Sequence, residues 1–329
     1  MSDLRYDPVF DFWTAIAEIR RDRPLEFLPN AQSFEQLICP FCSGNEDETP
    51  PATLLLDQQG HSLDLQTTAG WSSRVIPNKY PTYVANNHPA LEEVGPFLRS
   101  SMVGDQELVI PSPRHVISLA ELTAEEFLAG LIAAQHRIAS KRETSAIQHS
   151  MLFGNCRYEA GASVAHVHFQ LISSPIIPSS LQARARRYQE SLRSGAHLLE
   201  RVVAFELEQQ VRVVGETDDF VMVCPFASRL SFQVWIIPRH RPRPFWEASR
   251  AILGQIGELS QRYIQRIEEL LPKPAYNWML HQLPFQSTAD DYWFVEVVPR
   301  VAKTAGYEMG TDIWINPVAP ETASRRLKS

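Results

Sequence analysis

Two histidines and a glutamine occupy alternate positions in the segment 161–175, GASVAHVHFQLISSP. Strict alternation of polar and apolar residues predicts a half-buried β-strand, with His166, His168 and Gln170 on one face. A neutral imidazole is a good nucleophile toward phosphorus near pH 7 and leaves readily afterwards. Histidine is also a common metal ligand. The segment therefore predicts a site where imidazoles act on a phosphate, a metal ion or both.

A second set of potential ligands lies in the motif CPFC, which contains Cys39 and Cys42. C-x-x-C places two thiolates on one tight turn and supplies half of a tetrahedral zinc site. The sequence has no second C-x-x-C, so the other two ligands would be imidazoles, and we predict His115 and His166. This gives one structural zinc ion per chain. A redox-active C-x-x-C and a turn without metal are the alternatives.

The predicted metal site would leave His168 free for chemistry. A metal ion held by the neighbouring His166 would fix the strand, as a nucleophile requires. Upstream, NCRYEAGAS supplies Asn155, Gly161 and Ser163. Small residues there would let backbone N–H groups and a hydroxyl approach a phosphate. These residues are compatible with phosphoryl chemistry at His168, and by themselves they are equally typical of an ordinary loop.

Two stretches of the chain repeat one order of elements: strand, strand ending in Pro-Arg-His, helix, strand, strand. In the first, the helix follows a capping box made by Thr123 and Glu126. In the second, a long helix places apolar residues on one face between Ile252 and Leu270. We predict an internal duplication, with halves at 1–176 and 177–329. The Ser/Arg-rich segment 179–202 is predicted to be a connecting helix with a solvated basic face.

Aligning the two stretches indicates which half carries the chemistry. His166, His168 and Gln170 correspond to Tyr292, Phe294 and Glu296. The second half therefore lacks the histidine pair, and we expect it to bind no metal. Two histidines of the second repeated stretch, His240 and His281, are expected to be polar core or surface residues.

Composition excludes several classes of protein. The 329 residues carry a net charge of −7 with no offsetting Lys/Arg run, which argues against nucleic acid as a partner. No apolar run reaches the ~18 residues of a membrane span. The N-terminus MSDLRYDPVF does not resemble a signal peptide. Four cysteines in so long a chain do not form a disulfide framework. We expect a cytoplasmic protein.

Five motifs lie along the chain: RRDRP, CPFC followed by SGNEDETP, RVIPNKYP, the HxHxQ strand and AGYEMGTDIWINPVAPETA. These motifs, in this order, resemble those of the galactose-1-phosphate uridylyltransferase family of the histidine-triad superfamily, which includes ADP-glucose phosphorylases. The resemblance covers nearly the whole chain. It implies an α+β fold of two histidine-triad-like halves, with antiparallel sheets and packed helices. It also implies a homodimer with the active site near the subunit interface.

The resemblance further implies roles for individual residues. Cys39, Cys42, His115 and His166 would hold zinc, His168 would be the nucleophile, and Gln170 would bond the phosphate. The implied substrate-binding residues are Asn78, Asn155, Gly161, Ser163, Arg20, Arg23, Tyr307 and Glu308. The sequence departs from the family in the second half, which lacks a metal-binding histidine pair, and at Val167, where proline is usual.

Three functions are consistent with these residues. The first is a nucleotidyltransferase that moves a nucleoside monophosphate from a nucleotide sugar to a hexose 1-phosphate, in the manner of UDP-glucose:hexose-1-phosphate uridylyltransferases. An ADP-sugar phosphorylase with inorganic phosphate as acceptor is its close alternative. A histidine-triad hydrolase is less favoured, because such hydrolases carry a third histidine where Gln170 stands, and glutamine does not titrate. The third is a non-catalytic binding protein stabilised by zinc. It is disfavoured because it gives no reason for the first half to keep its histidines while the second half has lost them.

Overall fold

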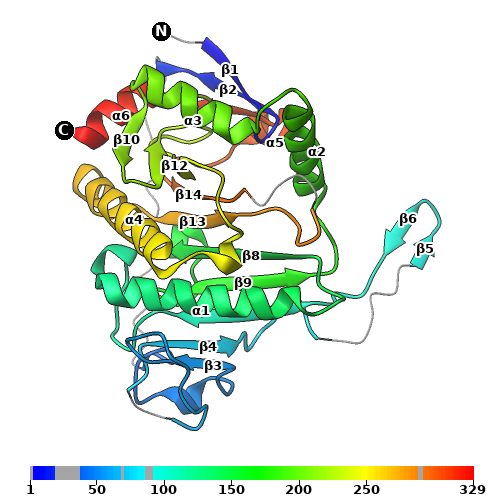
Figure 1. Ribbon diagram of the computed structural model, residues 1–329, viewed down its shortest axis with the longest axis vertical. Helices are drawn as coiled ribbons and strands as arrows, with labels where there is room; N and C mark the ends of the chain where they lie inside the picture. The colour runs from blue at the N-terminus through cyan, green and yellow to red at the C-terminus, as the bar shows by residue number, and fades with distance from the viewer. Residues whose placement is uncertain (1–2, 19–37, 68–69, 86–91, 288–291) are drawn as a thin grey trace.

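The computed structural model describes residues 3–18, 38–67, 70–85, 92–287 and 292–329 (Figure 1). Its centre is one antiparallel sheet that crosses the whole molecule. The order of its ten strands is β10 (Val213–Glu216), β11 (Phe220–Val223), β12 (Val234–Pro238), β14 (Phe294–Pro299), β13 (Tyr276–His281), β8 (His149–Cys156), β9 (Phe169–Ser174), β7 (Asp105–Ile110), β4 (Ser73–Pro77) and β3 (Leu54–Leu56).

The strand order is the same when the sheet is followed outward in either direction from the β8–β13 pair. One side runs β8, β9, β7, β4, β3, and the other runs β13, β14, β12, β11, β10. At the junction, Asn155 of β8 lies opposite Asn277 of β13. The α+β class with antiparallel sheets is thus confirmed, and the strand order agrees with two equivalent halves. The duplication and its boundary at residue 176 stay predictions.

Helices α1 (Ala124–Arg142) and α4 (Arg250–Leu270) pack side by side on one face of this sheet (Figure 1). The predicted capping box begins α1: the Thr123 hydroxyl accepts from the backbone of Glu126, and the Glu126 side chain accepts from the backbone of Thr123. Both helices turn apolar faces into the main core, where Phe127 and Ile256 are fully buried. Burial of this kind is the main stabilising term for such helices.

The opposite face of the second half is covered by several short elements. They are α2 (Ser179–Arg193), α3 (Leu198–Gln209) and a small sheet of β1 (Asp3–Asp7), β2 (Phe12–Ile16) and β15 (Ile313–Asn316). Next to them lie α5 (Gly306–Thr311) and α6 (Pro320–Lys328). Residues 3–16, placed by sequence in the first half, therefore pair with β15 and pack on the second half.

The segment 179–202 differs from the single solvated helix that the sequence predicts. It forms α2 and the start of α3, separated by a turn at Gly195, where φ is +113°. Arg184 of α2 is buried, and its guanidinium lies over the Phe10 ring and donates to Nδ1 of His281. Long aliphatic stems let arginines line apolar surfaces while their charged groups find partners.

The outer face of the first half is covered by residues 38–56, including η2 (Glu46–Glu48). Phe41 packs there with Trp71 and with Ile76 and Leu108 of the sheet. This cluster places the CPFC turn beside the end of β7. A separate hairpin of β5 (Glu92–Val94) and β6 (Phe97–Arg99) projects from the body (Figure 1). Within the described ranges, no helix combines the length and apolarity needed to cross a membrane.

Candidate active site and metal centre

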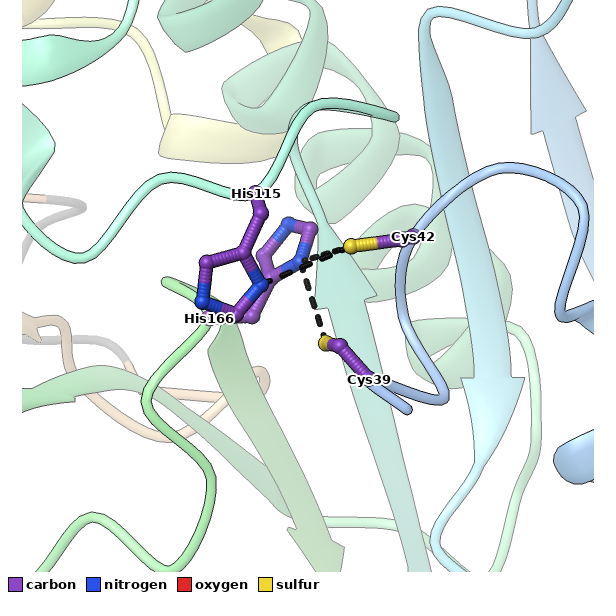
Figure 2. Close-up of side chains that lie close together, drawn as sticks. All are labelled: Cys39, Cys42, His115 and His166. Carbon is purple, nitrogen blue, oxygen red and sulfur yellow. Dashed lines mark hydrogen bonds between the residues drawn. The ribbon is translucent and has the colours of Figure 1, made fainter. Parts of the chain in front are cut away.

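Cys39, Cys42, His115 and His166 converge at one point, although the two histidines lie 73 and 124 positions after Cys42 (Figure 2). Nδ1 of His166 lies 3.5 Å from Sγ of Cys39 and 3.6 Å from Sγ of Cys42. Nδ1 of His115 lies 3.5 Å from Sγ of Cys42. The four ligand atoms all lie within 4.8 Å of one another.

These spacings fit a tetrahedral zinc site. Zinc–sulfur and zinc–nitrogen bonds of normal length place sulfur and nitrogen about 3.5 Å apart across a tetrahedral ion. The Nε2–H of His166 donates to the backbone carbonyl of Ser112 at 3.1 Å. That bond turns the Nδ1 lone pair toward the thiols, as the outer partner of a metal-bound histidine usually does. Sequence analysis missed Ser112, because a backbone carbonyl leaves no residue-type signal.

The acid–base properties of the ligands agree with this assignment. Burial, followed by the charge of His115, lowers the pKa of His166 to about 4, so the imidazole is neutral at pH 7. Burial and the adjacent Cys39 thiol raise the pKa of Cys42 to about 11. Metal binding therefore has to displace thiol protons, which makes affinity increase with pH.

The strand that the alternating pattern predicts through His166 and His168 begins later in the structure. β9 starts at Phe169, so His166 and His168 lie in the irregular segment just before it. The backbone N–H of Val167 bonds the carbonyl of Val116 outside the sheet ladder. In this segment His166 contacts the two thiols of the CPFC turn, and local alternation carries no information about that contact.

His168 is buried, and a single hydrogen bond determines its tautomer. Its Nδ1–H donates to the backbone carbonyl of His166 at 2.8 Å. Nε2 consequently carries the lone pair, because a neutral imidazole has one N–H. Burial lowers the pKa of His168, so the ring is neutral at pH 7. The Phe41 ring packs against it edge-on, with centroids 5.1 Å apart. The arrangement presents a fixed, unprotonated Nε2.

Gln170 and Asn155 each contact a second side-chain amide. Gln170 accepts at Oε1 from Nε2 of Gln106, at 3.2 Å. Asn155 accepts at Oδ1 from Nδ2 of Asn277, at 2.8 Å. Neither Gln106 nor Asn277 was identified from the sequence, since isolated amides in strands have no distinctive pattern.

The segment between Asn155 and His166 is a tight turn. Arg157 and Gly161 both have positive φ, of 68° and 94°. A Cβ atom at Gly161 would lie 3.4 Å from Nδ2 of Asn155, so glycine allows the close approach. Gly161 and Ser163 are both exposed. A small crevice beside this turn is lined by Leu119, Gly154, Asn155, Cys156, Val167, His168 and Tyr276.

Of the other predicted substrate-binding residues, some lie near His168 and Gln170 and others lie in α5 (Gly306–Thr311). Asn78 is partly buried, and its backbone N–H donates to the carbonyl of Gln106, which places it near Gln170. Tyr307 and Glu308 lie in α5, beside β15; Glu308 accepts from the backbone of Ala305, and Tyr307 is exposed. Among the described residues, no hydrogen bond links Tyr307 or Glu308 to His168. Arg20 and Arg23 lie outside the described residues.

The second half holds a different set of contacts at the equivalent strand. Phe294 stacks on His281, with ring centroids 4.8 Å apart. His281 donates from Nε2 to the buried Glu296 at 2.8 Å and accepts at Nδ1 from Arg184. Burial lowers the pKa of His281, so the ring is neutral. Both nitrogens are engaged by protein groups, as expected for a polar core histidine.

His240 is exposed and lines a hollow of about 390 Å³ between the end of β12 and the start of α4, on the second half. In the part of the chain that the structure describes, the Cys39 group is the one cluster of metal-ligating side chains. We therefore expect His240→Ala to leave the metal content unchanged when measured by atomic emission on purified protein. Loss of one metal equivalent would show that the second half also binds an ion.

Comparison with known proteins gives matches over the full chain. ADP-glucose phosphorylase from Arabidopsis thaliana is 29% identical and aligns with 99% of this chain and 92% of its own. Galactose-1-phosphate uridylyltransferase from Thermotoga maritima is 25% identical over 100% of this chain and 98% of its own. A crystal structure of the Arabidopsis phosphorylase with bound ADP-glucose superposes with a TM-score of 0.84, at 27% identity, covering 100% of this chain and 99% of that one.

The fold, the clustered histidines and these relatives show that the protein is similar over its whole length to the galactose-1-phosphate uridylyltransferases and to ADP-glucose phosphorylase, which are nucleotidyltransferases. The predicted resemblance is confirmed. A family model described as a domain of unknown function (DUF4921) matches residues 114–329, and the chain belongs to that family.

Proposed function

We propose that the protein transfers a nucleoside monophosphate from a nucleotide sugar to a phosphate-bearing acceptor through a covalent adduct on His168. The observation that carries this proposal is the bond from Nδ1 of His168 to the carbonyl of His166, which leaves Nε2 unprotonated. In the first half-reaction Nε2 bonds the phosphorus next to the nucleoside. The bond from that phosphorus to the bridging oxygen breaks, and the sugar 1-phosphate leaves with the electron pair.

The leaving group is already a phosphate, so it needs no proton from the protein. The proton on Nδ1 stays shared with the His166 carbonyl, which stabilises the positive charge on the ring. In the second half-reaction an acceptor phosphate oxygen bonds the same phosphorus, and the bond to Nε2 breaks. Donors from Asn155, Ser163 and Gln170 would stabilise the charge on the phosphoryl oxygens. Ping-pong kinetics follow from this sequence.

Cys39, Cys42, His115 and His166 would hold one zinc ion. With four protein ligands the ion has no open position, so its contribution would be to fix the backbone that carries His168. We further propose that the protein works in the cytoplasm, where thiols stay reduced. We also propose that the protein forms a homodimer and that Tyr307, which is exposed, lies near the subunit interface.

Two donor and acceptor pairs are to be compared. Uridylyl transfer to a hexose 1-phosphate is the reaction of most of the curated relatives. Phosphorolysis of an ADP-sugar is favoured by the relative with the higher identity and by the superposition on its ADP-glucose complex. Incubation of UDP-glucose or ADP-glucose with galactose 1-phosphate or inorganic phosphate separates the two reactions by their products. Failure of every pair to turn over would contradict the proposal.

The lowered pKa of His168 predicts how the adduct forms as pH changes. Only the neutral ring is a nucleophile, and burial keeps it neutral below the ordinary histidine pKa of about 6.5. The rate of adduct formation should therefore be flat from pH 8 to 6.5 and fall only at lower pH. Single-turnover labelling at each pH measures this. A half-loss at pH 6.5 or above would show an ordinary or raised pKa.

A further inference from the structure

The orientation of the two active-site amides can be worked out from backbone groups. Nδ2 of Asn277 donates to the backbone carbonyl of Ala160 at 2.9 Å and to Oδ1 of Asn155 at 2.8 Å. A backbone carbonyl only accepts, so the group of Asn277 that touches it must be the NH₂. The atom of Asn155 that faces this NH₂ is consequently its oxygen. The NH₂ of Asn155 makes one long bond, to the backbone carbonyl of Gly161 at 3.5 Å, which leaves its second N–H for a phosphoryl oxygen.

The same reasoning applies to Gln170. The backbone N–H of Thr82 donates to Oε1 of Gln106 at 2.8 Å, and a backbone N–H only donates. The NH₂ of Gln106 therefore faces Gln170 and donates to its Oε1 at 3.2 Å. Among the described residues, the NH₂ of Gln170 donates no hydrogen bond, so it is available to a phosphoryl oxygen. Two separate backbone groups thus lead to the same arrangement.

We propose that Asn277 and Gln106 are positioning residues that hold the amides of Asn155 and Gln170 with their NH₂ groups toward the transferred phosphoryl group. This inference rests on the proposed function. Phosphoryl oxygens accept hydrogen bonds, so an amide helps only if it presents NH₂. An amide free to rotate would also present its oxygen, which repels a phosphate oxygen. Donors fixed in advance need no reorganisation during the reaction.

The proposal gives the second half a defined part in the reaction. Asn277 lies in β13, directly opposite Asn155 in β8, at the junction of the two halves. Its bond to Ala160 also holds η4 (Tyr158–Ala160), the turn that leads to Gly161 and Ser163. Arg157 anchors the same turn to the second half, donating to the carbonyl of Pro274 and to Glu268 of α4. A half without its own histidine pair thereby positions one donor of the other half, Asn155.

The first test uses Asn277→Asp and Gln106→Glu at pH 8, where the new carboxyl groups are ionised. A carboxylate of nearly the same shape only accepts, so the partner amide turns its NH₂ toward it and its oxygen toward the phosphate. We expect each variant to label His168 about 10²-fold more slowly than wild type in a single turnover with an α-³²P-labelled nucleotide sugar. Asn277→Ala releases the Asn155 amide without turning its oxygen toward the phosphate. We expect this variant to label His168 only about 10-fold more slowly than wild type.

A double-mutant cycle separates positioning from general stability. If Asn277 acts through Asn155, adding Asn277→Ala to Asn155→Ala leaves the labelling rate of Asn155→Ala nearly unchanged. If Asn277 only supports the fold, the two losses multiply. Gln135→Ala is the matched control: its amide donates to the carbonyls of Phe245 and Ala248 between the same halves, away from His168. It should label at the wild-type rate.

Three outcomes would overturn the inference. The first is a wild-type labelling rate in both Asn277→Asp and Gln106→Glu. The second is a double variant, Asn155→Ala with Asn277→Ala, whose loss of labelling rate is the product of the two single losses. The third is a loss of labelling rate in Gln135→Ala as large as that in Asn277→Ala. Zinc content and thermal unfolding of each variant identify any that fails to fold, and Gln106→Glu then tests the proposal independently of β13. If wild-type protein takes up no label, the proposed function fails and this inference fails with it.

Discussion

The His168→Gly variant is expected to lose nucleotidyl transfer by at least about 10⁴-fold, because removal of a covalent nucleophile eliminates the pathway itself. His168 is not one of the four predicted zinc ligands, and its hydrogen bond to His166 uses the backbone carbonyl, not the imidazole. Its ring packs against Phe41. The variant should therefore retain its zinc. Initial rates with saturating donor and acceptor, together with metal analysis, measure both effects.

Two further histidine variants make this result specific. His136→Ala changes an exposed histidine of α1 and should keep full activity. His166→Ala removes a ligand of the metal site, so it should lose zinc first and activity as a consequence. Turnover of His168→Gly at the wild-type rate would exclude His168 as the nucleophile. Activity in His166→Ala that persists after metal loss would show that the ion does not support the reaction.

The second large effect is expected from Cys39→Ser, which removes a proposed zinc ligand beside the cluster of Phe41 and Trp71. Loss of a structural metal belongs to the class of single changes that cost of the order of 4 kcal/mol or more. We expect about one zinc equivalent in wild-type protein and none in the variant, with a sharply lower free energy of unfolding. A chelator should destabilise wild-type protein in the same way.

Cys224→Ser is the control for the cysteine substitution. Cys224 is completely buried and lies in the main core, so the variant introduces a hydroxyl at a comparable site without touching the metal ligands. It should keep its zinc. Two tightly bound zinc ions in wild-type protein, or equal zinc content in Cys39→Ser and wild type, would contradict the single Cys₂His₂ site.

Sequence patterns were sufficient for features that depend on local periodicity. The capping box at Thr123 and the apolar face of α4 are both present as predicted. The four predicted metal ligands, two in the CPFC turn and two far from it in the chain, also meet as predicted. Residue type was informative there, because thiols and imidazoles are few in this chain and zinc selects them.

Other features depend on contacts that no local pattern records. His166 and His168 precede β9, although their alternation continues that of the strand. In this segment His166 bonds the carbonyl of Ser112, and the backbone of Val167 bonds that of Val116 outside the ladder. The pairing of Asn277 with Asn155 follows from the register of β13 against β8, which the sequence does not specify. Arg184 is buried because residues 3–16 cover α2, a long-range contact.

The covalent adduct tests the central proposal most directly. Wild-type protein is incubated without acceptor in ADP-glucose or UDP-glucose labelled at the phosphorus next to the nucleoside, then denatured and separated from free nucleotide. We predict about one label per chain with at least one of the two donors. The label should lie on His168, be labile to acid as phosphoramidates are, and be discharged by inorganic phosphate or a hexose 1-phosphate. Absence of any protein-bound label under conditions where the full reaction turns over would contradict transfer through His168.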